Sequence, residues 1–369
     1  MNSQRNKRLN KYSYFDFQIV FIVAVLVMFG LLMVYSSSSY RAVVSGFEST
    51  YFFKKQLGFA AIGFIGMIVV AFIDFRIFRL FAKVLMIAAI ALLLCVMIFG
   101  VASHGRTRWI QIGPVQLQPS EIAKPILIIY LADICTDRSK NLAIGLEYFK
   151  LVILPLLCIG LIAKENLSTG IVCGVIFIGI LLVAAPKKSY VFVTLILIAF
   201  AAAFLIFCVG YRQDRIDAWL HVDTSEDGFQ TRQSLYAIGS GGLFGRGLGN
   251  SIQKLGFLPE SHNDMIFSVI CEELGLFGAI CIIALFLILV FRLKYISDNT
   301  RDRFGGLVIV GILIHVAAQF FVNVGVCTNL LPNTGVTLPF ISYGGTSLVF
   351  MLCEMGIALN ISRHMRPLE

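Results

Sequence analysis

Residues 264–291 read DMIFSVICEELGLFGAICIIALFLILVF, and this stretch decides the class of the protein. A helix that spans a membrane needs about 20 mostly apolar residues, and the stretch is long enough to be one. It begins at Asp264 and carries two adjacent acids, Glu272 and Glu273, further in. Acids at that depth are expensive in a bilayer. At least one of the pair is therefore expected to face the interior of a helix bundle and to pair with a cation.

The composition indicates a membrane protein and excludes most other classes. Of the 369 residues, 58% are hydrophobic and 14% are charged, whereas an ordinary soluble domain carries about 25% charged residues. A cytosolic enzyme, a disordered chain and a coiled coil are therefore excluded. The net charge of +9 is attributed to cytoplasmic loops and not to a nucleic-acid partner. The nine cysteines have no CxxC spacing, so neither a disulfide framework nor a zinc site is indicated.

Ten apolar runs predict an all-α, polytopic integral membrane protein with about ten transmembrane helices in a single domain over residues 1–369. Basic residues are denser in the loops on the side of the N-terminus. Residues 1–15 are therefore predicted to be a cytoplasmic basic tail, with both termini in the cytoplasm. The predicted spans are roughly residues 17–36, 56–73, 77–101, 120–135, 148–163, 167–185, 190–209, 264–291, 305–327 and 342–361.

Two irregular stretches lie on the predicted extracellular side. Residues 210–263, between the seventh and eighth spans, mix aromatic residues with charges and glycines, so this long loop is expected to fold against the bundle. Its glycines between Gly239 and Gly249 lack the GK[ST] ending of a phosphate loop, so nucleotide binding is not expected. Residues 328–341 predict a re-entrant outer loop. Irregular backbone at membrane depth is tolerated only where it is buried in protein or lines a cavity, which points to a site.

Charged residues near the outer ends of the spans are candidate site residues. Glu121 and Lys124 are three residues apart at the start of a span and so share a helix face. They form an internal ion pair or a charged patch at the mouth of a cavity, and these two interpretations are compatible. Arg106 and Arg108, beside Trp109, either recognise a diphosphate through their guanidinium forks or belong to an interfacial anchor.

Asp264 is the candidate for acid–base chemistry. A carboxylate at the membrane boundary can act as a general base if burial and neighbouring charges tune its pKa, or it can simply complement the helix dipole. Other polar residues lie inside the spans, and helix–helix hydrogen bonds are the expected role for each. These residues are Asp133, His315, Asn323 and Glu354.

Four blocks of the sequence resemble the SEDS family, the polytopic FtsW, RodA and SpoVE proteins of shape, elongation, division and sporulation. The blocks occur in family order across roughly residues 13–366. The stretch from Gln253 to Gly275 is more similar to the FtsW and SpoVE type than to RodA. The blocks are residues 105–113 with 118–124, residues 233–249, residues 258–275 and residues 331–347.

The resemblance implies a peptidoglycan glycosyltransferase that polymerises lipid II. In such enzymes the GlcNAc 4-hydroxyl of one lipid II attacks the anomeric carbon of the lipid-linked chain, inverts it and expels undecaprenyl diphosphate. The essential outer-loop aspartate of the family matches Asp264, which is therefore the expected catalytic base. The residues expected to bind substrate are Glu121, Lys124, Arg106, Arg108, Arg246, Lys254, His262 and Ser342. A divalent cation, Mg²⁺ or Mn²⁺, is left open as a cofactor, since the sequence contains no defined ligand set.

The resemblance also implies a location and partners. The expected location is the bacterial cytoplasmic membrane, with the active site on the extracellular face. The expected partners are a class B penicillin-binding protein and other divisome proteins, together with lipid II and undecaprenyl diphosphate. A lipid II flippase and a non-catalytic division scaffold are the alternatives, and roles in division, elongation and sporulation stay open.

One position departs from the family pattern. Many members have a Gln-Pro-Asp-Leu-Gly-Thr block, where this chain reads Lys164-Glu165-Asn166-Leu167-Ser168-Thr169. The family acid is thus replaced by Asn166, and the position is left out of the expected catalytic set.

Overall fold

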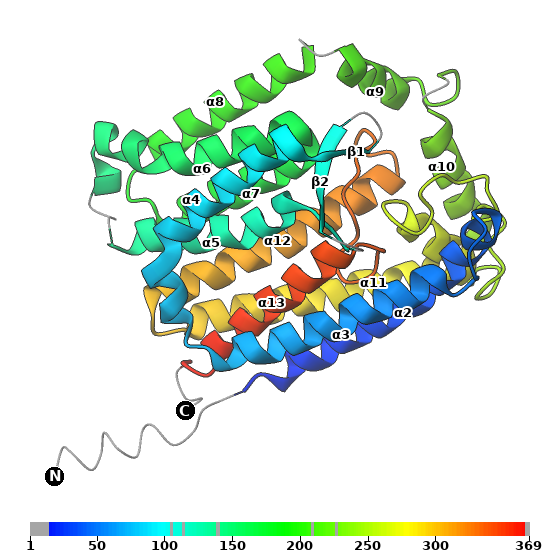
Figure 1. The fold of residues 1–369 in the computed structure, drawn as a ribbon, viewed down its shortest axis with the longest axis horizontal. Helices are drawn as coiled ribbons and strands as arrows, with labels where there is room; N and C mark the ends of the chain where they lie inside the picture. The colour runs from blue at the N-terminus through cyan, green and yellow to red at the C-terminus, as the bar shows by residue number, and fades with distance from the viewer. Residues whose placement is uncertain are drawn as a thin grey trace.

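A computed structural model of the chain describes residues 15–103, 106–112, 115–137, 141–207, 210–225 and 228–365. Over these residues, long helices lie side by side in a bundle (Figure 1). The all-α class predicted from the sequence is confirmed. The long helices are α2 (Phe17–Val44), α3 (Tyr51–Phe72), α4 (Phe75–Phe99), α5 (Pro119–Asp137), α6 (Gly145–Glu165), α7 (Leu167–Ala184), α8 (Lys188–Phe207), α11 (Ile266–Asn299), α12 (Arg303–Cys327) and α13 (Gly345–Ser362), and a short 3₁₀ turn, η1 (Asn141–Ala143), precedes α6.

The two ends of the bundle differ. The start of α2 and the end of α13 lie together at one end, which we term the terminal end (Figure 1). There Asp16 caps α2 and pairs with Arg292 of α11 at 2.6 Å. The opposite end, termed the site end, carries two short helices from residues 210–263 (Figure 1). These are α9 (Gly210–Leu220) and α10 (Phe229–Gly241), and α10 packs on α11.

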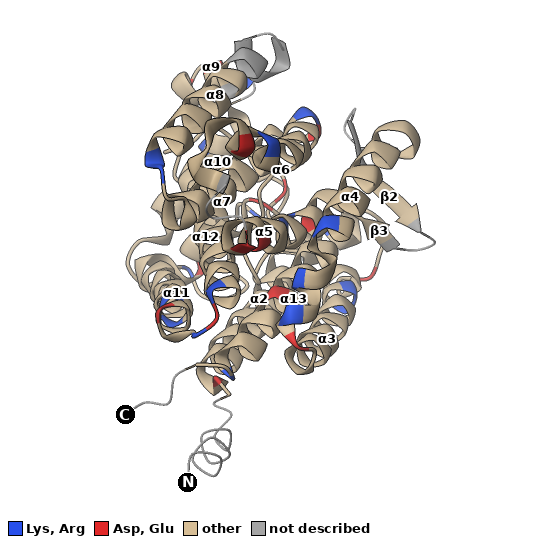
Figure 2. Cartoon of the chain, turned by 90° about the vertical axis from the view of Figure 1, so that its left-hand side faces the viewer, with Lys and Arg blue, Asp and Glu red and all other residues tan. Residues whose placement is uncertain are grey.

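The helices have the composition of membrane spans. Eight of the described helices are long and apolar enough to cross a membrane. Figure 2, which views the chain from the terminal end, shows that little of the helical ribbon is coloured as Lys, Arg, Asp or Glu. The other two predicted spans correspond to α5, which is mostly buried and contains four charged residues, and to α8, whose apolar part is Lys188–Ala201. The total of ten spans, and the side of the membrane on which each end lies, stay predictions.

A small β-sheet precedes α5, and the sequence analysis did not predict it. Strands β1 (Val101–Ser103), β2 (Arg106–Ile112) and β3 (Val115–Leu117) form an antiparallel sheet in that order. Apolar and polar residues alternate in Ile110-Gln111-Ile112, at the end of β2, and in Val115-Gln116-Leu117, which is β3. This two-residue period is that of a strand. Thr346, at the start of α13, donates to the carbonyl of Gln116 at 3.1 Å and so attaches the sheet to the site end.

Helix α11 is broken, whereas the sequence predicted one continuous span over residues 264–291. Gly275 has φ +67°, which interrupts the helix and is a conformation that glycine adopts at little cost. The residues that follow α10 dock against the break. Arg246 and Gly247 donate their amides to the carbonyls of Glu272 and Glu273, each at 2.9 Å. The break therefore leaves these two carbonyls paired, as burial requires.

Candidate functional site

Asp264 lies in the turn that precedes α11, and its side chain is only partly satisfied. Its main-chain carbonyl accepts hydrogen bonds from Nδ2 of Asn323 at 2.7 Å and from the thiol of Cys327 at 3.5 Å. The side chain is 9% exposed, and Oδ1 has no hydrogen-bond partner among the described residues. A buried polar atom without a partner costs about 1–3 kcal/mol. Such an atom in a fixed position suggests a function.

The surroundings of Asp264 raise the pKa of its carboxyl to a value at which the group can act as a base at neutral pH. Burial is the main cause that raises this pKa, and the charge of Glu260 adds to it, while Arg215 opposes both. The result is a pKa of about 7. A general base is most effective when its pKa is near the working pH.

The turn that carries Asp264 is held in an unusual conformation. Glu260 has φ +52°, a left-handed conformation that is costly for a residue with a side chain. The Glu260 carboxylate accepts from Nδ2 of Asn263 and pairs with Arg41 of α2 at 3.1 Å. Ser261 adds a hydrogen bond to the carbonyl of Ser37 at 3.2 Å. The contacts with α2 therefore fix the turn, and the fixed turn orients Asp264.

The backbone of residues 328–344 forms the opposite wall of the site. A Cβ atom placed on Gly335 would lie 4.0 Å from Oδ2 of Asp264, so this segment runs beside the carboxylate. Two of its residues, Asn329 and Phe340, have positive φ angles of 58° and 61°. The segment is seated on α2, because a Cβ on Gly30 would lie 2.7 Å from the Cα of Ile341.

Helix α9 also contacts this wall. Trp219 donates to the carbonyl of Asn329 at 3.0 Å, and Arg215 donates to the carbonyl of Asn333 at 3.2 Å. These bonds bring the guanidinium of Arg215 into the neighbourhood of Asp264. Arg215 was not among the residues predicted for the site, since it is one of several charges in a long loop with no motif around it.

A row of buried polar residues runs along one face of α12 and ends at Asp264. His315, Gln319, Asn323 and Cys327 are each four residues apart, which places them on the same face. We call these four residues the polar ladder. Asn323 bonds both the carbonyl of Asp264 and that of Val336, the latter at 2.9 Å. Asn323 therefore connects the two walls, and it does not make the helix–helix hydrogen bond that the sequence predicted.

The middle of the polar ladder holds the predicted ion pair of α5. Nζ of Lys124 lies 2.9 Å from Oε2 of Glu121, which confirms that the two residues form an internal pair. Lys124 also donates to Oε1 of Gln319 at 3.0 Å, and Nε2 of Gln319 donates to the carbonyl of Thr337 at 3.1 Å. Gln319 and Asn323 are one helical turn apart, about 6 Å. The Glu121–Lys124 pair is thus connected to the wall beside Asp264.

The deep end of the polar ladder is a second buried pair. Nδ1 of His315 lies 2.8 Å from Oε2 of Glu354 on α13, and its Nε2 lies 3.0 Å from Oε1 of Gln319. The helix–helix hydrogen bond predicted for His315 and Glu354 is therefore confirmed. Gln319, the residue that joins the two pairs, was missed. The four-residue spacing of polar residues in the span was the signal that indicates it.

His262 and Ser342 lie near Asp264 in sequence or in space, but both have structural contacts. The ring of His262 packs between Phe52, with centroids 4.8 Å apart, and Tyr343, at 5.7 Å. Burial lowers the pKa of His262 to about 4, so the ring is uncharged at neutral pH. Oγ of Ser342 accepts from the amide of Leu338 at 2.8 Å. The substrate-binding roles of both residues stay predictions.

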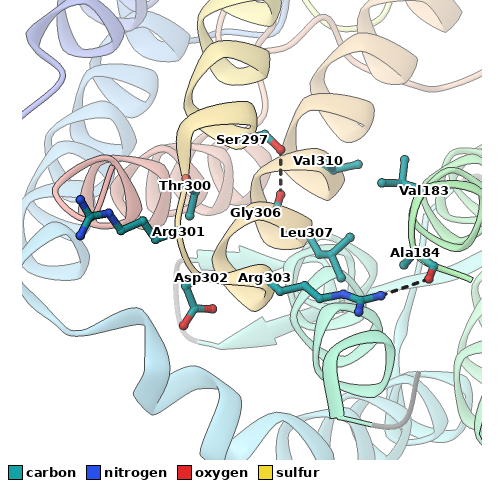
Figure 3. Close-up of a pocket in the computed structure, with 10 residues that line it drawn as sticks. All are labelled: Val183, Ala184, Ser297, Thr300, Arg301, Asp302, Arg303, Gly306, Leu307 and Val310. Carbon is teal, nitrogen blue, oxygen red and sulfur yellow. Dashed lines mark hydrogen bonds between the residues drawn. The ribbon is translucent and has the colours of Figure 1, made fainter. Parts of the chain in front are cut away.

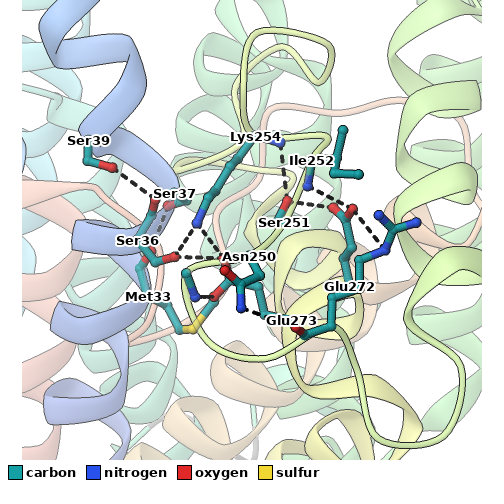
Figure 4. A network of polar contacts seen from close by, with 12 residues as sticks. Met33, Ser36, Ser37, Ser39, Asn250, Ser251, Ile252, Lys254, Glu272 and Glu273 are labelled. Carbon is teal, nitrogen blue, oxygen red and sulfur yellow. Dashed lines mark hydrogen bonds and ion pairs between the residues drawn. The ribbon is translucent and has the colours of Figure 1, made fainter.

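The two adjacent acids of α11 engage Arg246 and Lys254, and Figure 4 shows the contact between Lys254 and Glu273. Lys254 is 6% exposed, and its Nζ lies 2.7 Å from Oε1 of Glu273. Nε of Arg246 lies 3.7 Å from Glu272. The predicted pairing of at least one of these acids with a cation is thus confirmed. Diphosphate binding by Arg246 and Lys254 stays a prediction, and this geometry favours a role for Lys254 in fixing the loop.

Three other predictions have simpler outcomes. Arg106 and Arg108 belong to β2, but their side chains lie outside the described part of the structure. Among the described residues, no group of three or more His, Cys, Asp or Glu side chains could hold a metal ion, so the cation stays a prediction.

Asn166 caps α7 by accepting from the amide of Thr169 at 3.4 Å. Asn and Asp are equally good caps, so the replacement of the family acid preserves this role.

A shallow cavity of about 350 Å³ lies at the terminal end, away from Asp264 (Figure 3). It is lined by the end of α7 and by the turn between α11 and α12, where Arg303 donates to the carbonyl of Ala184 at 3.3 Å. None of the residues predicted for the site lines this cavity.

Known proteins share this fold. The rod shape determining protein RodA of Thermus thermophilus superposes with a TM-score of 0.70 at 26% identity, over 95% of this chain and 98% of RodA. A chain from a structure described as "Structural coordination of polymerization and crosslinking by a peptidoglycan synthase complex" superposes with a TM-score of 0.79 over 96% of this chain and 100% of that chain. At 24% identity, that second likeness shows the fold alone.

Sequence relatives extend over nearly the whole chain. A protein of Geobacter metallireducens named "Probable peptidoglycan glycosyltransferase FtsW" is 39% identical over 99% of both chains. Stage V sporulation protein E of Bacillus subtilis is 38% identical over 95% of this chain and 98% of its own. The model of the family described as "Cell cycle protein" matches residues 17–367. The chain therefore belongs to the FtsW/RodA/SpoVE family, as its sequence motifs indicated.

Proposed function

We propose that this protein is a peptidoglycan glycosyltransferase that polymerises lipid II, with Asp264 as its general base. The observation that carries the proposal is the buried Asp264 carboxyl, with an unpartnered Oδ1 and a pKa of about 7. Membership in a family whose relatives are named peptidoglycan glycosyltransferases supports the substrate class.

The proposed reaction is an inverting displacement. A carboxylate oxygen of Asp264 takes the proton of the GlcNAc 4-hydroxyl of one lipid II molecule. The hydroxyl oxygen attacks the anomeric carbon of the lipid-linked chain from the face opposite the leaving group. The new glycosidic C–O bond forms as the bond to the diphosphate breaks, and undecaprenyl diphosphate leaves with the bonding electron pair. One general base contributes about 10²–10⁴-fold to the rate of such a step.

Positive charge near Asp264 is proposed to stabilise the departing diphosphate. Arg215 lies beside the wall of the site and affects the charge of Asp264. Arg106 and Arg108 belong to β2, and a hydrogen bond from Thr346 of α13 attaches the sheet that contains β2 to the site end. The ammonium of Lys124 is held by Glu121, so it contributes a balanced pair and no net charge. The described residues around Asp264 do not form a chelating cluster, and no step of this mechanism depends on a metal.

The location and the partner belong to the same proposal. We place the site end at the extracellular face of the bacterial cytoplasmic membrane, because lipid II is consumed there and basic residues favour cytoplasmic termini. A class B penicillin-binding protein is the proposed partner that crosslinks the product. This assignment is supported by the shared fold with a chain of a peptidoglycan synthase complex.

The test is polymerisation of lipid II by the purified chain in liposomes with its penicillin-binding protein. Wild type is expected to make glycan strands, and Asp264→Asn is expected to make none above background. Asp217→Asn, in which the changed carboxylate is 73% exposed on α9, is the matched control and is expected to retain activity. Strands made by Asp264→Asn would overturn the base assignment. Movement of lipid II across the bilayer without polymer would favour a flippase.

A further inference from the structure

The loop formed by residues 242–257 has its polarity reversed relative to a loop in water. Its one lysine, Lys254, is 6% exposed and points inward to Glu273. The side chain of its one arginine, Arg246, is 37% exposed, and its Nε turns toward Glu272 at 3.7 Å. Phe244, in contrast, is 81% exposed. The exposed apolar side chains of the loop are Leu243, Phe244, Leu248, Ile252, Leu255 and Phe257. A cation turned inward and large apolar groups turned outward are the arrangement expected of a surface that contacts lipid.

The depth of the loop follows from its bonds to the break in α11. The amide of Leu276 donates to the carbonyl of Gly242 at 2.9 Å, and that of Phe277 donates to the carbonyl of Leu243 at 3.1 Å. Leu243 and Phe244 therefore lie beside the first turn after Gly275. Leu276 and Phe277 are themselves 53% and 65% exposed, so the apolar surface of the loop continues the apolar surface of α11.

That turn of α11 lies inside the hydrocarbon region. The uncharged helix between the break at Gly275 and Arg292 is residues 276–291, which is 16 residues and about 24 Å of helix. The hydrocarbon core is about 30 Å thick, so the whole of this run is needed to cross it. Its first turn must therefore be immersed, and the loop segment bonded to that turn lies at the same depth.

Backbone amides of the loop are hydrogen-bonded within the protein, as a medium without water requires. The amides of Arg246 and Gly247 are bonded to the carbonyls exposed by the break in α11. The amide of Gly249 donates to Oε2 of Glu273 at 3.0 Å, and that of Ile252 donates to Oε1 of Glu272 at 2.9 Å (Figure 4). In a bilayer, each unpaired backbone group costs several kcal/mol. The two buried acids thus serve as acceptors for the amides of an immersed loop.

We infer that the 242–257 loop is a membrane anchor, with Leu243 and Phe244 inserted among the acyl chains of the leaflet at the site end. The occupant of this surface is lipid and not another protein, because the exposed face of the loop is continuous with the lipid-facing residues Leu276 and Phe277 of α11. The inference depends on the membrane location of the bundle and is independent of the proposed reaction.

The experiment uses tryptophan fluorescence of the full chain in nanodiscs. Phe244→Trp adds an emitter to the loop, and the emission of wild type, which contains two tryptophans, is subtracted. Leu330→Trp is the matched control. Leu330 is 67% exposed, but it follows the end of α12, nearly two turns beyond the level at which Asn323 meets Asp264. Leu243→Trp repeats the test in case Phe244→Trp does not fold.

The expected result is opposite quenching of the two sites. The emission added at position 244 should be quenched when phospholipids brominated on their acyl chains replace ordinary ones, and it should resist acrylamide in the water. The emission added at position 330 should show the reverse. Quenching of position 244 by acrylamide but not by bromine would overturn the anchor. Protection of position 244 from both quenchers would also overturn it, since protein would then cover the loop.

Discussion

Asp264 and Glu273 are buried acids separated by nine positions, yet their surroundings are opposite. Both carboxylate oxygens of Glu273 accept hydrogen bonds, since Ser36, Lys254 and the amide of Gly249 all donate to them. Among the described residues, Oδ1 of Asp264 has no hydrogen-bond partner. The comparison separates two uses of a buried carboxylate. A saturated carboxylate holds the chain together, whereas an unsaturated one, kept in place by its main chain, is available for a proton.

The largest effect is expected from removing the unsaturated acid. Asp264→Asn should reduce the rate of glycan polymerisation by about 10²–10⁴-fold, because the amide cannot accept the hydroxyl proton. The measurement is polymer length and yield from lipid II in proteoliposomes. A variant within a few-fold of wild type would show that the unsaturated oxygen has no catalytic role.

The same variant should not damage the fold. The pKa of Asp264 rises from 3.8 to about 7 in the folded protein. Ionisation of the side chain therefore costs the folded state stability progressively as the pH rises from about 4 through about 7. Asp264→Asn removes that cost, so its melting temperature in detergent should exceed that of wild type at pH 8, with a smaller difference at pH 5. A lower melting temperature at pH 8 would contradict the assignment.

The saturated acid should show the opposite pattern. Glu273→Gln leaves Lys254 as a buried cation without its partner, and breaking a buried pair costs about 3–5 kcal/mol. Thermal unfolding and the yield of folded protein measure this loss. The double variant Glu273→Leu with Lys254→Met removes both charges and should recover much of the stability. Glu48→Gln, whose partner Lys54 is 64% exposed, is the control and should change little.

A smaller effect on rate is expected at the polar ladder. Gln319→Met keeps the side-chain length but loses the bonds to Lys124 and to Thr337. A hydrogen bond to a charged group is worth about 1.5–3 kcal/mol, so kcat should fall by about 10–10²-fold. Gln319→Glu restores the acceptor for Lys124 but not the donor for Thr337, and it should recover part of the rate. An unchanged kcat in both variants would show that the polar ladder does not influence the rate of the reaction.

The smallest effect is a shift in pH dependence. The rate should rise with pH as Asp264 loses its proton, with a midpoint near its pKa of about 7. The charge of Glu260 is the second cause, after burial, that raises this pKa. Glu260→Gln should therefore move the rising limb of the pH–rate profile towards lower pH. A limb that stays in place or moves upward would show that Glu260 does not influence the base.

Much of the fold was predictable because lipid imposes a simple pattern. The apolar runs marked the helices, and the three-residue spacing of Glu121 and Lys124 indicated their pair. The break at Gly275 was not predictable in the same way. A single glycine in an apolar run is tolerated in a continuous helix, and the residues that dock against this one are some thirty positions away. The small sheet was missed because two of its strands have only three residues each and the sheet occurs between two long apolar runs.

The site was only partly predictable from the sequence. The sequence predicts Asp264 as the base from its position at a membrane boundary and from its family motif. The cations were harder to assign, because a lysine in a loop looks the same in sequence whether it faces a ligand or an acid. Lys254 meets Glu273, and this depends on where α11 turns. Arg215 reaches the wall of the site only through the packing of α9, for which the sequence contains no local signal.

The contact between Gly30 and Ile341 has a consequence for biosynthesis. The wall built from the residues just before α13 rests on α2, the first described helix. A ribosome releases Gly30 roughly three hundred residues before Ile341. The proposed active site therefore cannot form on a chain that still lacks residues 328–344. The membrane contains no working catalyst until that segment has been made.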